Sequence, residues 1–167
     1  MILAVDVDYR DGCAYIGGVT FENWTDDKEK DTFVSFLGNV NEYIPGKFYL
    51  RELPCILRLI EEHKLKPKYI VIDGFVFLGG EGKPGLGKYL YDALNNKVAI
   101  IGVAKRPFKG IPAACEVYRR LSKNPLYVTS AGVTPEDAKT FIRSMHGDYR
   151  VPTLLKRVDQ VCRKNKS

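Results

Sequence analysis

The sequence predicts an α/β fold in which helices cover both faces of a mixed β-sheet. Two observations lead to this class. The first forty residues hold three strand-like segments separated by turn signals, which is typical of an antiparallel meander. After residue 46, segments with apolar residues at helical spacing alternate with short aliphatic runs, which indicates helices and buried strands. The length of 167 residues suits a single domain over residues 1–167.

The N-terminal meander follows from local patterns. We expect strands over residues 2–9, 13–22 and 30–37, because these segments are rich in aliphatic or alternating apolar residues. The pair Asp11-Gly12 is a tight-turn signal between the first two strands. The three segments therefore predict strands that run up, down and up again.

The rest of the chain predicts alternating helices and strands. Pro45-Gly46 fixes a loop before a helix over residues 48–63, in which Pro54 falls within the first turns. Further helices are expected over residues 86–94, 113–121, 134–145 and 151–163, and strands over 68–72, 98–103 and 126–129. Thr134 caps one of these helices, with Pro135 at its first position. Because these strands are short and aliphatic, we expect them to be parallel and joined by right-handed crossovers.

Composition narrows the class of protein. The net charge of +6 favours a polyanionic partner, since neutralised phosphates release counterions, but it is equally consistent with an uninvolved basic surface. The four cysteines are widely spaced, so we expect neither a zinc site nor disulfides, and a reducing cytoplasm. No apolar run approaches the roughly 18–20 residues that span a bilayer, so no membrane partner is expected.

Three acidic residues lie at positions that favour a metal-binding role. Asp6 lies inside an apolar strand, where an unpaired acid is costly, and Asp73 ends the aliphatic strand before Gly74. Glu52 lies on the helix that follows the Pro-Gly turn. Together they could hold one divalent cation, because magnesium prefers oxygen ligands. The alternative from spacing alone is that the strand-end acid caps a turn and the helix acid is solvated.

The order of short motifs resembles the endonuclease V family from residue 2 to residue 163. The motifs are Val5-Asp6-Val7, Tyr43-Ile44-Pro45-Gly46, Arg51-Glu52-Leu53-Pro54, Ile72-Asp73-Gly74, Gly102-Val103-Ala104-Lys105 and Tyr149-Arg150-Val151-Pro152, with Arg157 and Asp159 after them. The second and third motifs together with the fifth are specific in combination, whereas each alone would be weak.

This resemblance implies a ribonuclease H-like fold and a metal-dependent endonuclease. Such an enzyme cuts a DNA or RNA strand 3′ to a deaminated purine, inosine, with Mg²⁺, or Mn²⁺ in its place. The expected partner is DNA or RNA that contains inosine or other deaminated bases, and no obligate protein partner is evident. By the resemblance, Asp6, Glu52, Asp73 and Asp159 are the metal-binding and catalytic carboxylates. Lys105 matches the catalytic lysine beside the scissile phosphate, where an ammonium stabilises developing charge.

The resemblance also implies contacts with the altered base. Tyr43, Ile44 and Pro45 match a wedge that fills the gap left when this base leaves its stack. Gly46 and Gly74 match glycines that line the base pocket, where the backbone must come close to the base.

Two positions depart from the family pattern after the strand-end acid. Phe75 and Gly79 stand where the family has histidines, and Phe75 could stack on a base or plug the pocket. This departure keeps two alternatives open beside the nuclease. One is a non-catalytic or altered-specificity nucleic-acid-binding relative, and the other is an interaction domain with no nucleic-acid role.

Overall fold

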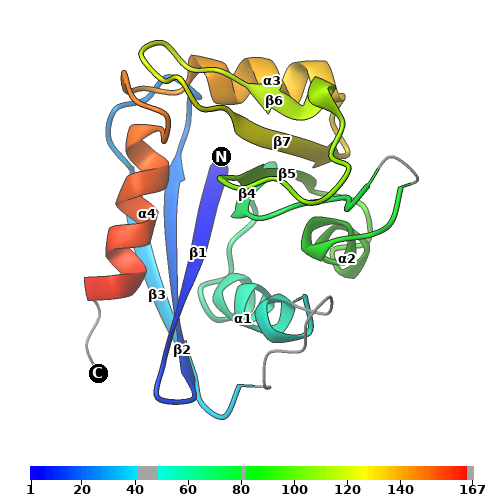
Figure 1. The fold of residues 1–167 in the computed structure, drawn as a ribbon. Coiled ribbons are helices and arrows are strands. Elements are labelled where there is room, and N and C mark those ends of the chain that lie inside the picture. The colour runs from blue at the N-terminus through cyan, green and yellow to red at the C-terminus, as the bar shows by residue number, and fades with distance from the viewer. Residues whose placement is uncertain (41–48, 80–81, 165–167) are drawn as a thin grey trace.

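A seven-stranded mixed sheet runs through the centre of the protein (Figure 1). The computed structural model describes residues 1–40, 49–79 and 82–164. The strands are β1 (Ile2–Arg10), β2 (Cys13–Phe21), β3 (Asp31–Leu37), β4 (Tyr69–Asp73), β5 (Ala99–Ala104), β6 (Glu116–Val117) and β7 (Leu126–Ala131). Within the described residues, the helices are α1 (Tyr49–Glu62), α2 (Leu86–Ala93), α3 (Pro135–Ser144), α4 (Thr153–Lys164) and a short 3₁₀ turn, η1 (Ala113–Cys115).

The strand order is β3-β2-β1-β4-β5-β7-β6. The predicted meander is confirmed, since β1 pairs antiparallel with β2 and β2 with β3. Strands β4 and β5 then add in parallel beside β1, as expected for aliphatic runs buried on both faces. The sheet is therefore mixed, and its centre is β1, β4 and β5.

Two expectations for the last third of the fold were wrong, for one shared reason. Strand β7 pairs antiparallel with β5 rather than parallel, and residues 113–121 form η1 and β6 rather than a helix. Parallel pairing needs a long crossover that returns the chain to the starting edge of the sheet. Without a helix over residues 113–121 to make that crossover, the chain turns back at the same edge.

Two apolar cores lie on opposite faces of the sheet. Helices α3 and α4 cover one face, and α1 and α2 cover the other (Figure 1). Alternation along β1 places Ala4 in the α4-side core and Leu3 and Val5 in the α1-side core. Asp6, two residues after Ala4, therefore belongs to the face that α4 covers.

The helix start predicted at Thr134 is confirmed. Its Oγ1 accepts a hydrogen bond from the backbone amide of Asp137 at 3.2 Å, and Pro135 begins the helix. Among the described residues, no helix combines the length and apolar character that crossing a membrane requires.

Candidate active site

Strand register brings two of the predicted acids to the same level of the sheet. In the parallel pair, Ala4 of β1 lies opposite Val71 of β4, and Asp6 and Asp73 each follow two residues later. Both partners of that pair belong to the α4-side core, so both acids extend along the same face. Asp6 and Asp73 line the same cleft, and the charge of Asp73 contributes to the raised pKa of Asp6.

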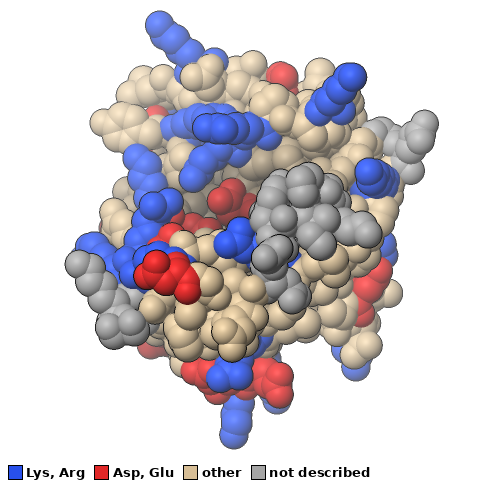
Figure 2. Space-filling view, turned by 60° about the horizontal axis from the view of Figure 1, so that its bottom comes forward, with Lys and Arg blue, Asp and Glu red and all other residues tan. Residues whose placement is uncertain are grey.

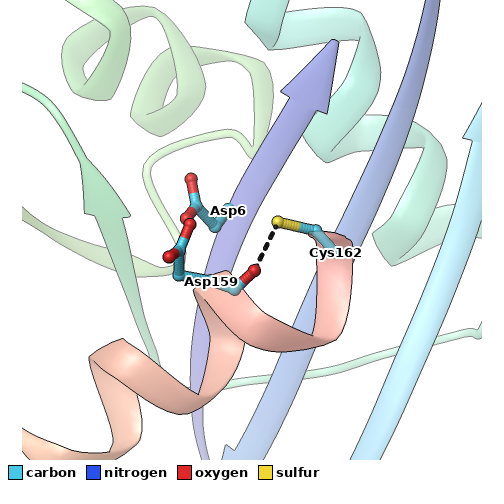
Figure 3. Close-up of side chains that lie close together, drawn as sticks. All are labelled: Asp6, Asp159 and Cys162. Carbon is cyan, nitrogen blue, oxygen red and sulfur yellow. Dashed lines mark hydrogen bonds between the residues drawn. The ribbon is translucent and has the colours of Figure 1, made fainter. Parts of the chain in front are cut away.

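The other two acids approach from helices. Asp159 lies in the middle of α4, and Glu52 lies in the first turn of α1. The carboxylate oxygens of Asp6 and Asp159 and the Sγ of Cys162 lie within 4.8 Å of one another. Figure 3 shows these side chains pointing toward each other from β1 and α4. The thiol of Cys162 donates a hydrogen bond to the backbone carbonyl of Asp159 at 3.2 Å.

Burial and mutual repulsion disturb the ionisation of these acids. Burial raises the pKa of Asp6 to about 7, assisted by the charge of Asp73 and a hydrogen bond with Asp159. Burial likewise raises the pKa of Glu52 to about 8, and the charges of Asp73 and Asp6 add to the rise. The side chains thus form a group with excess negative charge, which a divalent cation would relieve.

Basic side chains stand at the border of this group. Although Asp73 is exposed toward the cleft, enclosure by its walls raises its pKa, and the charge of Lys105 opposes the rise. Burial acts to raise the pKa of Asp159, but hydrogen bonds from Arg163, at 2.7 Å, and from Asp6 outweigh it, so the pKa is lowered. Asp6 therefore holds a proton more readily than Asp159 does.

A cleft opens beside the acids. It contains about 400 Å³ of empty volume, part of it open to solvent, and three of the predicted site residues line it: Asp6, Asp73 and Lys105. Its remaining lining is apolar and comes from β1, β4, β5, β7 and the segment from Val151 into α4. Figure 2 shows acidic atoms within a hollow of the surface and Lys and Arg side chains around it. A negative floor with a basic rim suits a cation below and a phosphate above.

The predicted base-contact residues are only partly described. Tyr43, Ile44, Pro45 and Gly46 lie outside the described residues. Gly74 follows the strand-end acid with a φ of 148°, a conformation that favours glycine.

The turn after Asp73 packs tightly on the neighbouring strands. A Cβ at Gly102 would lie 2.5 Å from the carbonyl oxygen of Gly74, so glycine is required there. The backbone amide of Val76 donates to Oγ1 of Thr129 at 2.8 Å. Phe75 meets Phe108 edge to face, with ring centroids 4.8 Å apart. The side chain at the first expected histidine position thus belongs to an aromatic pair.

Both histidines of the chain lie away from the cleft. The ring of His63 bonds the carbonyl of Val34 at 2.9 Å, and the ring of His146 bonds Oγ1 of Thr153 at 2.9 Å. Neither belongs to the lining of the cleft.

Two residues at the site were missed by sequence reasoning. Cys162 follows Asp159 by three residues on a helix, a spacing that places side chains on one face and could have revealed it. The guanidinium of Arg150 donates to the carbonyls of Lys105 and Pro125, which ties the strand end that carries the lysine to the segment before β7. Its motif was recognised, but no local signal indicates that bond.

Comparison with known proteins agrees with this architecture. A curated endonuclease V of Streptomyces avermitilis is 29% identical over 145 residues, 73% of this chain, and the match spans 61% of the relative's length. The crystal structure of the Streptomyces avermitilis endonuclease V is similar with a TM-score of 0.76 and 24% identity, over 98% of this chain and 79% of that one.

Two animal proteins share the fold. Ciona intestinalis endonuclease V, crystallised with a DNA containing inosine followed by a ribo-adenosine, matches with a TM-score of 0.80 and 18% identity, over 98% of this chain and 84% of that one. The human protein matches with a TM-score of 0.74 and 19% identity, over 98% and 82% of the two chains. The predicted ribonuclease H-like fold is thereby confirmed.

The family comparison covers most of the elements that carry the site. The model of the endonuclease V family matches residues 1–119, which contain β1, α1, β4 and β5. Three of the four acids and the cleft lysine fall within the matched residues, and Asp159 follows on α4. The chain belongs to the endonuclease V family.

Proposed function

We propose that this protein is a metal-dependent endonuclease that cuts a DNA or RNA strand on the 3′ side of a deaminated purine, inosine. The observation that carries the proposal is the closeness of the Asp6 and Asp159 carboxylates, each of which offers an oxygen within 4.8 Å of the other. Burial and the charge of Asp73 raise the pKa of Asp6 to about 7, and burial with the charges of Asp73 and Asp6 raises that of Glu52 to about 8, so all four acids interact electrostatically. Family membership supports it, as does the inosine-containing DNA bound to the Ciona intestinalis relative.

The donor set fits magnesium, with manganese as an alternative. Hard divalent cations prefer several carboxylate oxygens, and these four acids supply them from β1, α1, β4 and α4. When bound, the ion would activate water and stabilise the leaving oxygen of a phosphodiester. A cation would also offset the repulsion that adds to burial in raising the pKa of Asp6 and Glu52.

The remaining residues act on the strand. The ammonium of Lys105, at the rim of the cleft, stabilises negative charge on the phosphate oxygens. Arg150 holds the backbone of Lys105 in place through its carbonyl. Gly74 lets the backbone approach the base, and Phe75 offers an aromatic face or edge to it. In this proposal Tyr43, Ile44 and Pro45 fill the space that the displaced base leaves.

A cleavage assay with matched variants tests the proposal. Inosine-containing DNA and RNA strands are incubated with Mg²⁺ and the wild type, Asp6→Asn or Glu52→Gln. Glu61→Gln is the control, because Glu61 is an exposed acid on the same helix as Glu52. We expect both site variants to lose activity by more than about 100-fold and the control to match the wild type. Equal rates in Asp6→Asn and the wild type, or no cutting by either, would contradict the proposal.

The aromatic pair at Phe75 and Phe108 favours a second candidate, an altered-specificity or non-catalytic nucleic-acid-binding relative. An apolar edge at this position cannot bond a phosphate or a metal-bound water as a histidine would. In that case the protein would bind inosine-containing strands in Mg²⁺ without cutting them, or would cut a different lesion faster. Parallel binding and cleavage measurements with inosine, uracil and undamaged strands separate these outcomes.

A further inference from the structure

A buried arginine fastens two loops together near the cleft. Arg119 is only 2% exposed, and its guanidinium donates hydrogen bonds to the backbone carbonyls of Met145, Gly147 and Tyr149. The backbone amide of Leu121 also donates to the carbonyl of Asp148. These hydrogen bonds tie the loop after β6 to the loop after α3, because a buried guanidinium is costly unless its donors find partners.

These fastened loops display apolar side chains to solvent. Tyr118 is 53% exposed, Leu121 74% and Tyr149 67%, and they are three of the six large hydrophobic residues exposed among the described residues. Backbone that is tied down beneath exposed aromatic rings suits a binding surface, since the rings lose little freedom when a partner stacks on them.

A second hollow lies under Tyr149. About 560 Å³ of empty volume, much of it open, is bounded by the loop after α3 and by the first turns of α4. The lining residues are Gly147, Tyr149, Val151, Thr153, Lys156, Arg157 and Gln160. No acid is among them. The ammonium of Lys156 lies 5.3 Å from the centroid of the Tyr149 ring, and Arg157 is paired with Glu29 at 3.1 Å.

This hollow adjoins the acidic cleft. Val151 lines both, and the neighbouring Arg150 bonds the carbonyl of Lys105 at the rim of the cleft. A strand whose phosphate rests at Lys105 therefore passes close to an exposed aromatic ring and an exposed ammonium, those of Tyr149 and Lys156.

We propose that Tyr149 and Lys156 form a nucleotide subsite for an unpaired part of the same strand, flanking the cut. The ring of Tyr149 stacks on a base, and the ammonium of Lys156 holds the adjoining phosphate. An aromatic face with a basic lining is the combination that single strands bind, and stacking requires a base free of its complement. This inference rests on the proposed function and adds to it where the flanking strand lies.

The dependence of affinity on strand length tests the subsite. The probes are a short fluorescent single strand centred on inosine and two strands extended by about four nucleotides, one on the 5′ side and one on the 3′ side. Dissociation constants are measured by anisotropy with Ca²⁺, which takes the same oxygen ligands as Mg²⁺. The proteins are the wild type, Tyr149→Ala, Tyr149→Phe, Lys156→Gln and the control Lys66→Gln, an exposed lysine in the loop before β4.

We expect the wild type to bind one extended strand about tenfold tighter than the short strand. Tyr149→Ala should lose this gain, and Tyr149→Phe should keep it, because stacking needs the ring and not the hydroxyl. Lys156→Gln should reduce the gain and lower the salt slope by roughly 0.7, the value for one phosphate contact on a single strand. Lys66→Gln should behave as the wild type.

The two proposals fail in different ways. If the wild type cuts the short strand with Mg²⁺ but Tyr149→Ala keeps the whole length-dependent gain, the subsite is refuted and the proposed function stands. If the wild type neither binds nor cuts any inosine strand, both the subsite and the proposed function are refuted. Thermal melting of each variant checks folding, and the exposed side chain of Tyr149 predicts no change.

Discussion

At the scale of single residues, the acids of the cleft gain their chemistry from where the fold places them. Asp6 sits between the apolar residues Val5 and Val7 of β1, and its carboxylate lies beside that of Asp159. Such an arrangement is unfavourable for the metal-free protein, because charge is gathered where burial disfavours it. A bound divalent cation would stabilise this arrangement, because it would neutralise the gathered negative charge.

Arg150 gives the first prediction at this scale. Because its guanidinium holds the carbonyls of Lys105 and Pro125, Arg150→Gln should let Lys105 drift from the phosphate. We expect kcat to fall roughly 10- to 100-fold with little change in KM, as a small misplacement of a catalytic group does.

The double variant separates positioning from general instability. In a Lys105→Ala background, adding Arg150→Gln should cost no further activity, since the residue through which Arg150 acts is already gone. Additive losses in the double variant would contradict this role, and so would a fall in the melting temperature that accounts for the lost activity.

At the scale of elements, α4 reaches the sheet only because β2 offers glycine beneath it. A Cβ at Gly17 would lie 2.8 Å from the backbone nitrogen of Cys162 and 3.1 Å from the carbonyl oxygen of Val158. This close approach of α4 to β2 brings a carboxylate oxygen of Asp159 within 4.8 Å of one of Asp6. The packing of one helix on one strand therefore completes the group of acids.

Gly17→Ala should push α4 away from β2 and weaken both the fold and the site. We expect a loss of about 1–3 kcal/mol in the free energy of unfolding, measured with denaturant, and a parallel loss of Mn²⁺ affinity. Gly38→Ala is the matched control, because a Cβ there would meet only the ring of Phe36 at an ordinary 3.6 Å. An unchanged free energy of unfolding in Gly17→Ala would contradict this account, because it would show that a Cβ fits between β2 and α4.

Local sequence pattern predicted most elements but not the segment between β5 and β7. Strands β1 to β5 and the cap at Thr134 follow from periodicity and turn chemistry, which act within a few residues. The segment over residues 113–121 has helical spacing, yet its conformation is set by Arg119, which bonds carbonyls some 30 residues further along the chain. Long-range bonds of this kind leave no periodic signal.

The residues of the site likewise fall into two groups, those that local sequence pattern predicted and those that it did not. Asp6 and Asp73 stand out locally, because an acid in or at the end of an aliphatic strand is unusual. Asp159 came only from the family resemblance, since an acid on an amphipathic helix normally faces solvent. Cys162 was not expected at all, because its nearness to the acids depends on how α4 docks.

At the scale of the whole molecule, ionisation of the acids links pH to stability. The folded protein holds protons on Asp6 and Glu52 up to pH about 7 and 8, whereas the reference values for the free side chains are 3.8 and 4.5. Because the folded pKa is raised, the stability that these bound protons contribute is fully present below the unfolded pKa of about 4 and is lost progressively as the pH rises to the folded pKa of 7 to 8.

The metal-free protein should therefore melt at a lower temperature at pH 8.5 than at pH 5, by roughly 2–4 °C for each kcal/mol lost. Added Mg²⁺ should raise the melting temperature more at pH 8 than at pH 6, because protons no longer compete for the carboxylates. Asp6→Asn should flatten the dependence on pH. Melting curves across this range check all three, and a metal-free melting temperature that rises from pH 5 to 8.5 would contradict the assignment.

Direct titration with Mn²⁺, followed by electron paramagnetic resonance, tests the central claim that these acids bind a divalent ion. The wild type should bind Mn²⁺ and release it to excess Mg²⁺, and Asp73→Asn should bind at least about tenfold more weakly. Asp92→Asn, which changes an exposed aspartate on α2, should bind as the wild type does. Equal affinity in Asp73→Asn and the wild type would show that the ion, if bound, is held elsewhere.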